Sequence, residues 1–238
     1  ERETRGRKGK QPDGGSKTRE AKLGCVFTQT TVDRKGYAVR DEASTTFVGA
    51  IESSEEFGGR IYAEAMRRGI THAEKLVLLC DAASYNWEIA ATHFPGAIEI
   101  VDLYHARQHL HTLCAVLLPD ESNALKRQEN RWRKMLDKGD VKSILREAQK
   151  RLPRSGNRRK AAQKEIRFFR KNASRMRYGE YRAQGLFTGS GVVEAGCKTV
   201  IGKRLKQSGM EWTVRGANAI IALRCCHLSG RIEEFWEQ

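Results

Sequence analysis

Two short apolar runs in this chain each stop at an aspartate. Leu76-Val-Leu-Leu-Cys80 is followed by Asp81, and Ala97-Ile-Glu-Ile-Val101 is followed by Asp102. Short apolar runs of this kind are typical of buried strands, and the residues after Asp81 favour a turn into a helix. Open α/β sheets bind ligands at the carboxyl ends of their strands. Asp81 is therefore a candidate metal ligand, and the alternative is that it only caps the following helix.

The rest of the first half continues the same α/β pattern. β-rich stretches over residues 21–31 and 45–53 predict an antiparallel pair of strands, with a turn at Asp33-Arg-Lys-Gly36. Ser53 and the acids after it predict the start of an amphipathic helix that ends at Gly69. Further helices are predicted from Ser84 to His93 and from Leu103 to Pro119. Strands therefore come first as a pair and then alternate with helices.

Positive charge is concentrated in one part of the sequence. The chain has 44 Lys and Arg against 29 Asp and Glu, a formal charge of +15. Residues 120–182 hold 21 basic and 8 acidic side chains, whereas residues 21–119 hold 9 and 12. An imbalance of this size favours a polyanionic partner over a merely solvated helix face. Interleaved aromatic residues favour a helical insertion that lies along DNA: Trp132, Phe168, Phe169, Tyr178 and Tyr181.

Composition divides the chain into four segments. A basic loop or tail is predicted over residues 1–20, and the first part of an α/β core over residues 21–119. A helical basic insertion follows over residues 120–182, and the C-terminal helical part of the core over residues 183–238. Because the chain opens in basic sequence without an initiator Met, we expect it to be a piece of a larger protein.

Glu194 is the only acidic residue between Arg182 and Glu211. It follows the loop Gly189-Ser-Gly191 at the start of a predicted helix. Its position suits a catalytic carboxylate, and it equally suits a favourable partner of the helix dipole. Four basic residues follow it and are predicted to contact phosphates: Lys198, Lys203, Arg204 and Lys206.

No stretch approaches the roughly 18 apolar residues of a membrane span, and no signal peptide is present, so a cytoplasmic, nucleoid-associated protein without a membrane partner is predicted. The six cysteines lack a repeated Cys-x-x-Cys spacing and predict buried thiols rather than disulfides or zinc ligands: Cys25, Cys80, Cys114, Cys197, Cys225 and Cys226. A zinc site of His105, His109 and the late cysteines is the alternative.

Several stretches carry a resemblance that covers nearly the whole chain. They are Gly6-Arg-Lys-Gly-Lys-Gln-Pro-Asp13, Ala21-Lys-Leu-Gly-Cys-Val-Phe27, His93-Phe-Pro-Gly-Ala97, Val101-Asp-Leu-Tyr-His-Ala-Arg107, Met176-Arg-Tyr178, Gly189-Ser-Gly-Val-Val-Glu-Ala-Gly-Cys-Lys198 and Ser208-Gly-Met-Glu-Trp-Thr-Val-Arg-Gly-Ala-Asn218. Together they resemble ISKra-type transposases, bacterial insertion-sequence enzymes of the DDE superfamily. The resemblance implies a ribonuclease H-like mixed sheet with flanking helices, lacking its opening strand and interrupted by the all-α basic insertion.

The resemblance also implies a metal site. In that family three acids bind two divalent ions, Mg²⁺ or Mn²⁺, and the second and third acids correspond to Asp81 and Glu194. Asp102 and His105 correspond to a supporting Asp-x-x-His element. The family's first acid lies upstream of the motif that begins at Gly6 and is absent from this chain. The family usually places glycines on both sides of the second acid, where this chain has Cys80 and Ala82.

The implied activity is metal-dependent DNA cleavage and strand transfer by a homo-oligomer acting on transposon ends and target DNA. With two acids the site is incomplete, so residues 1–238 alone are expected to be inactive. A ribonuclease H-like nuclease and a non-enzymatic DNA-binding remnant are the alternatives. The predicted nucleic-acid contacts are Arg7, Lys8, Lys10, Arg131, Arg133, Lys134, Arg158, Arg159, Lys160, Lys198, Lys203, Arg204 and Lys206.

Overall fold

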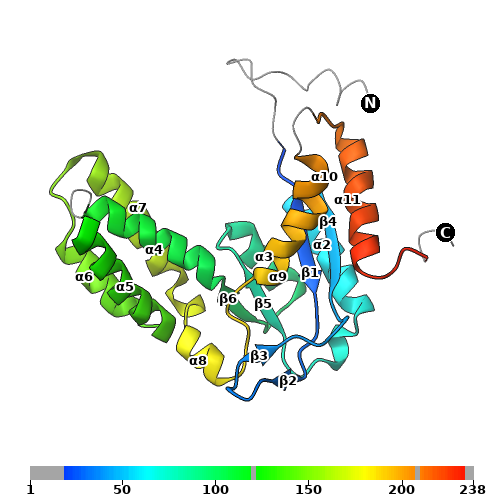
Figure 1. The fold of residues 1–238 in the computed structure, drawn as a ribbon, viewed down its shortest axis with the longest axis horizontal. Coiled ribbons are helices and arrows are strands. Elements are labelled where there is room, and N and C mark those ends of the chain that lie inside the picture. The colour runs from blue at the N-terminus through cyan, green and yellow to red at the C-terminus, as the bar shows by residue number, and fades with distance from the viewer. Residues whose placement is uncertain (1–18, 119–121, 207–209, 234–238) are drawn as a thin grey trace.

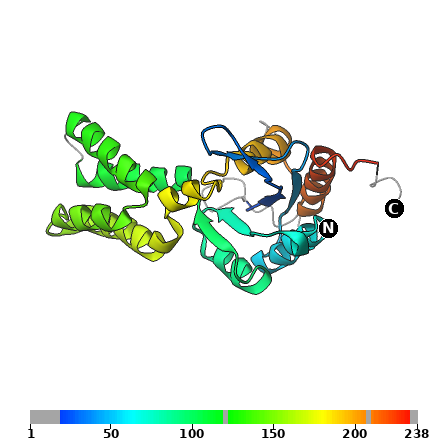
Figure 2. The same ribbon diagram turned by 90° about the horizontal axis from the view of Figure 1, so that it is seen from below.

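The computed structural model describes residues 19–118, 122–206 and 210–233 of the chain. They form a mixed α/β structure in which paired strands and their covering helices make a core (Figure 1). A bundle of helices between Leu103 and Ala183 projects from this core as an arm, and Figure 2 shows the same separation from a second side. The predicted α/β class is confirmed.

The strands form three separate pairs. β1 (Lys22–Val26) pairs antiparallel with β4 (Thr46–Ala50), as the sequence predicted. β2 (Thr31–Val32) and β3 (Ala38–Val39) form a small antiparallel hairpin across the predicted turn. β5 (Val77–Cys80) lies parallel to β6 (Ile98–Val101), with Cys80 opposite Val101. Asp81 and Asp102 follow the two predicted strands, and the structure shows that these strands are adjacent and parallel.

Helices that precede the arm in the sequence and helices that follow it both pack on the strand pairs. α2 (Ser54–Arg67) begins in a capping box formed by Ser53 and Glu56, and α3 (Ser84–His93) links β5 to β6. The C-terminal part comprises α9 (Gly191–Gly196), a π-helical turn, η3 (Cys197–Gly202), α10 (Lys203–Leu205) and α11 (Val214–Leu228). α11 packs on β4, where Asn218 exchanges two hydrogen bonds with the backbone of Ile51. This contact joins the C-terminal helix α11 to the segment that follows β4.

β1 and β5 are close in space without sharing hydrogen bonds. Val26 of β1 and Leu78 of β5 pack into one hydrophobic cluster with side chains of α2 and α3. At the other end of β1, Lys22 Nζ lies 5.4 Å from the ring centroid of Tyr85, in the first turn of α3. β1 therefore runs opposite to β5. Within the described ranges each of these two strands has one hydrogen-bonded neighbour.

The arm consists of α4 (Leu103–Leu117), α5 (Ser122–Lys138), α6 (Val141–Lys150), α7 (Gly156–Asn172), the 3₁₀ turn η2 (Ala173–Arg175) and α8 (Tyr178–Ala183). α4 packs against both α5 and α7, so the bundle begins at Leu103. The helical character predicted for residues 120–182 is seen wherever that segment is described.

The aromatic residues of the arm lie inside it, which contradicts the expectation that they stack along DNA. Trp132, Phe169, Tyr178 and Tyr181 are all buried in the main hydrophobic cluster. Phe168 is half-buried and stacks on the His109 ring, with ring centroids 3.6 Å apart. Aromatic residues spaced among charges are the pattern of an amphipathic helix, and here they fill the bundle interior.

A few specific contacts fix the arm to the core. The Tyr178 hydroxyl donates to the backbone oxygen of Val101 in β6 over 2.9 Å. The Arg175 guanidinium lies 4.3 Å from the ring centroid of Trp87 in α3 and forms an ion pair with Glu99 of β6. The main hydrophobic cluster also runs without a break from β6 into the arm.

None of the described helices is long and apolar enough to cross a membrane. All six cysteines are free thiols, so the expectation that they do not form disulfides is confirmed. Cys114 and Cys225 are buried, and burial raises the pKa of each thiol to about 12. Cys197 is exposed, so the prediction of buried thiols is wrong at that position.

Candidate functional site

Asp81 is exposed at the carboxyl end of β5. Its Oδ1 accepts hydrogen bonds from the Ala83 backbone N–H at 3.1 Å and the Asn86 side-chain amide at 2.7 Å. One carboxylate oxygen thus shapes the turn into α3, which is the capping alternative left open by the sequence. The other oxygen, Oδ2, has no hydrogen-bond partner among the residues described. The same side chain can therefore order the turn and still offer an oxygen to a ligand.

Ala82 does not strain the turn beside Asp81. Among non-glycine residues in the described ranges, only Ala43 has a positive φ. Ala82 therefore adopts ordinary backbone angles at a position where the resembling family usually has glycine. The departure from the family pattern at this position leaves the local backbone unstrained.

Asp102 has a structural role. Its side chain is only 3% exposed, and its Oδ1 accepts the His105 backbone N–H at 2.7 Å, which caps α4. Its Oδ2 accepts the Ser190 backbone N–H at 2.5 Å. Because both oxygens accept backbone hydrogen bonds, Asp102 holds the loop that leads into α9. Each carboxylate oxygen of this buried side chain is thus engaged in one backbone hydrogen bond.

His105 is a half-buried imidazole in the first turn of α4. Burial lowers its pKa most strongly, and nearby His109 lowers it further, while Asp81 and Asp102 act in the opposite direction. The His105 and His109 rings meet edge to face at 4.8 Å between centroids. His109 Nδ1 lies 2.6 Å from Oε2 of buried Glu165 in α7. His105 therefore lies within the electrostatic influence of Asp81, and His109 links it to Glu165 on α7.

Glu194 is exposed in the first turn of α9. α9 lies against β1 and β4, and a Cβ on Gly196 would come within 2.6 Å of the Phe47 ring. Glu194 thus belongs to the side of the core formed by β1 and β4, whereas Asp81 ends β5. Two hydrogen bonds tie the loop before α9 to the end of β6 and the start of α4: the Ser190 N–H donates to Asp102 Oδ2, and the Leu103 N–H donates to the Thr188 backbone oxygen.

The described residues do not form a complete metal site. They contain no group of three or more His, Cys, Asp or Glu side chains arranged to hold an ion. Two divalent ions need carboxylates that converge from several elements, and Asp81 and Glu194 alone do not supply that set. The zinc alternative also fails, because His105 and His109 lie in the arm whereas Cys225 and Cys226 lie on α11 against β4.

The predicted basic residues fall into three groups. Arg7, Lys8 and Lys10 lie outside the described residues. Three arm residues have internal partners: Arg131 pairs with Glu147, Arg158 donates to the Val116 oxygen, and Arg159 donates to the Pro153 oxygen. The others are exposed on α5, α7 and the α9–α10 region: Arg133, Lys134, Lys160, Lys198, Lys203, Arg204 and Lys206.

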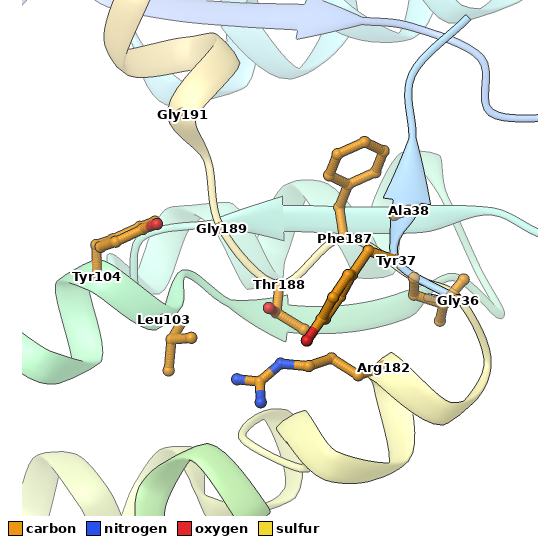
Figure 3. A pocket seen from close by; sticks show the side chains of 11 residues that line it. Gly36, Tyr37, Ala38, Leu103, Tyr104, Arg182, Phe187, Thr188, Gly189 and Gly191 are labelled. Carbon is orange, nitrogen blue, oxygen red and sulfur yellow. The ribbon is translucent and has the colours of Figure 1, made fainter. Parts of the chain in front are cut away.

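Sequence reasoning missed a pocket of about 290 Å³ where the hairpin, the first turn of α4 and the loop before α9 meet (Figure 3). Its lining includes Tyr37, Leu103, Tyr104, Arg182, Phe187 and Thr188. These residues come from four separate parts of the sequence, and no local motif connects them. The available signal was Gly189, whose missing side chain allows close packing against the Tyr104 ring.

Comparisons of the chain with protein-family models, with curated proteins and with solved structures find no match. Assignment of a function therefore depends on the geometry of this chain's own residues and on the resemblance of its motifs.

Proposed function

We propose that this chain is part of an insertion-sequence transposase of the DDE type. Asp81 and Glu194 act as two of its catalytic acids, Asp102 and His105 support them, and the arm is the main DNA contact. The observation that carries the proposal is the double hydrogen bonding of Asp102. It ties the edge where Asp81 lies to the loop that starts the helix of Glu194.

A ribonuclease H-like core is consistent with the strand pairs. β1 and β5 run in opposite directions and share a hydrophobic cluster, and each lacks a second hydrogen-bonded neighbour within the described ranges. One further strand, parallel to β5 and antiparallel to β1, would join these pairs into a single mixed sheet. Such a strand would end beside Asp81 and below α9. A third acid at its end would complete the ligand set for Mg²⁺ or Mn²⁺.

Residues 1–238 by themselves are expected to bind DNA without cutting or joining it. The reason is that the described residues contain no group of three or more Asp, Glu, His or Cys side chains placed to hold a metal ion. The test is a cleavage and strand-transfer assay with element-end DNA and Mg²⁺ or Mn²⁺. Metal-dependent strand transfer that is lost in Asp81→Ala would show that these two acids suffice, and it would overturn this expectation.

The DNA-binding part of the proposal has a separate test. Arg133, Lys134 and Lys160 are exposed on the arm, so replacing all three by Gln removes three charges from the proposed contact surface. Each lost phosphate contact lowers the slope of log affinity against log salt by about 0.9, so the slope should fall by about 2 to 3 and duplex affinity roughly 10-fold.

A matched variant controls for net charge. Arg60, Arg67 and Lys75 are exposed on the core outside the β2–β3 hairpin, and replacing them by Gln removes the same charge from a different surface. The slope of log affinity against log salt should be the same for this control as for the unmodified chain. Equal losses in both triple variants would contradict the arm as the main DNA contact, because the effect would then follow net charge alone.

The incomplete ligand set also favours a second candidate, a DNA-binding protein without enzymatic activity. The discriminating variants are Asp81→Ala and Glu194→Ala. If they leave duplex affinity unchanged, and if adding a further strand that ends in an acid also fails to generate activity, the chain is a DNA-binding protein only. Activity that appears with the added strand and disappears in Asp81→Ala identifies the transposase.

A further inference from the structure

We propose that the pocket between the β2–β3 hairpin and the first turn of α4 accepts one unpaired nucleobase of a nucleic-acid strand. The proposal rests on the proposed function, because it takes nucleic acid as the ligand and adds a site that reads its single-stranded form. The pocket begins at Leu103, directly after Asp102, so a base held there would place its strand along the edge that carries Asp81.

Two exposed aromatic rings flank this pocket. Tyr37 is 56% exposed and Tyr104 is 53% exposed, and they lie on opposite sides of it with Leu103 and Thr188 between them (Figure 3). Single-stranded nucleic acids stack their bases on exposed aromatic rings. The buried aromatics of the arm cannot perform this role, whereas these two tyrosines can.

Tyr104 is held in place before any ligand arrives. Its ring lies so close to Gly189 that a Cβ there would be 2.7 Å from Cε2 of the ring. The Arg107 guanidinium also lies 5.7 Å from the ring centroid and is itself fixed by a bidentate ion pair with Asp137. A ring that is already ordered loses little conformational entropy when a base stacks on it.

Tyr37 is also fixed by its backbone. Its N–H donates to Asp33 Oδ1 at 2.8 Å, and its carbonyl accepts the Asp33 N–H at the same distance. The hairpin is anchored by the Gln29 side chain, which donates to the Gly185 oxygen at the end of α8. Contacts among the hairpin, the arm and the loop before α9 therefore hold the backbone that carries the two rings.

Polar groups on the pocket wall suit a base or its phosphate. Nη1 of the Arg182 guanidinium donates to the Asp137 backbone oxygen at 3.2 Å, and Nη2 lies 4.0 Å from Asp137 Oδ1 in an ion pair. A guanidinium has five N–H donors, so further donors remain for a ligand. Arg182 and the Thr188 side chain face the space between the tyrosines (Figure 3). The pocket of about 290 Å³ is too small for a base pair in a duplex, so the fitting ligand is an unpaired base.

The test measures binding of a short single-stranded DNA that contains 2-aminopurine, whose fluorescence is quenched when it stacks. Tyr37→Leu and Tyr104→Leu should each weaken single-strand affinity roughly 5- to 10-fold and reduce the quenching, whereas Tyr37→Phe and Tyr104→Phe should keep both. Tyr62→Leu is the matched control, because Tyr62 is a 38% exposed tyrosine on α2, far from the pocket lining.

The outcomes separate this proposal from the proposed function. The double variant Tyr37→Leu, Tyr104→Leu should keep its unfolding midpoint. If it also keeps the affinity for single-stranded DNA and the quenching, the proposal that the pocket binds a base is wrong, while salt-dependent duplex binding through the arm still stands. Tyrosine-dependent binding of single-stranded RNA in preference to DNA would support the pocket and contradict a DNA transposase. Free deoxyadenosine monophosphate binding as tightly as the oligonucleotide would overturn the assignment to a strand.

Discussion

Between residues 120 and 182 of the arm the large aromatic side chains are buried or half-buried and the positive charge lies outside, whereas the core is nearly neutral and is built from small strand pairs. Residues 120–182 carry 21 basic and 8 acidic side chains, and residues 21–119 carry 9 and 12. The candidate acids Asp81 and Glu194 belong to the core, and most of the exposed basic surface belongs to the arm. The difference shows that this chain separates electrostatic attraction from the groups suited to chemistry, and Asp102, Arg175 and His105 connect the two regions.

The largest expected effect on the free energy of unfolding comes from removing one buried side chain from the interior of the arm. Trp132 is fully buried and its Nε1 donates to Glu147 Oε2 at 2.8 Å. Trp132→Ala should lower the free energy of unfolding by about 3 to 5 kcal/mol, since it removes a large apolar side chain and leaves a cavity. Urea unfolding monitored by circular dichroism measures this loss. Trp212→Ala, which alters a tryptophan that is 36% exposed, should change stability by less than about 0.5 kcal/mol.

Asp102→Asn tests the bond between the two sides of the core. An asparagine can accept one of the two backbone N–H groups but presents its own N–H₂ to the other, so a loss of about 2 kcal/mol is expected. Asp140→Asn is the control, because Asp140 caps α6 through a single bond to Ser143 and asparagine is an equally good cap. Equal losses of unfolding free energy in both variants would contradict the special role of Asp102.

Arg175→Leu weakens the joint between arm and core. The variant loses a cation–π contact with Trp87 and a partly exposed ion pair with Glu99. Each contact is worth up to about 1 kcal/mol, and the leucine keeps part of the packing, so the net loss should be about 1 kcal/mol. The thermal unfolding transition should become broader if the arm and the core then unfold less cooperatively. Arg177→Leu, an exposed neighbour that pairs within α8, serves for comparison.

The smallest effect concerns pH. Burial, and then His109, hold the pKa of His105 below its ordinary value of 6.5. The unfolded chain therefore binds a proton at this site more readily than the folded chain, and stability from this source falls as pH drops through 6.5. His105→Gln should lose less unfolding free energy than the unmodified chain between pH about 7.5 and about 5.5. His227→Gln, an exposed substitution on α11, should follow the unmodified curve.

Much of the fold could be predicted because its signals are local. The runs that end at Asp81 and Asp102 became adjacent parallel strands, and Ser53 with Glu56 started a helix through a capping box. The site was predicted less completely. The resemblance predicted a supporting role for Asp102, but its bond to Ser190 spans 88 residues and has no counterpart in local spacing. The pocket beside Tyr104 escaped prediction for the same reason.

The aromatic residues of the arm show why a pattern can have two interpretations. Trp132 and Phe169 alternate with basic residues, which suits stacking on bases and suits packing of an amphipathic bundle equally well. Sequence spacing specifies which residues share a helix face but not what covers that face. The structure shows that other helices of the arm cover it.

The sequence by itself determined the order of strands and helices, the position of two aspartates at strand ends and the concentration of charge in one segment, because periodicity, capping and net charge depend on neighbouring residues. Only the tertiary structure decided that Asp102 faces Ser190, that the arm's aromatics are buried and that Tyr37 and Tyr104 face one pocket. These features depend on segments that are distant in sequence and meet only when their apolar faces are removed from water.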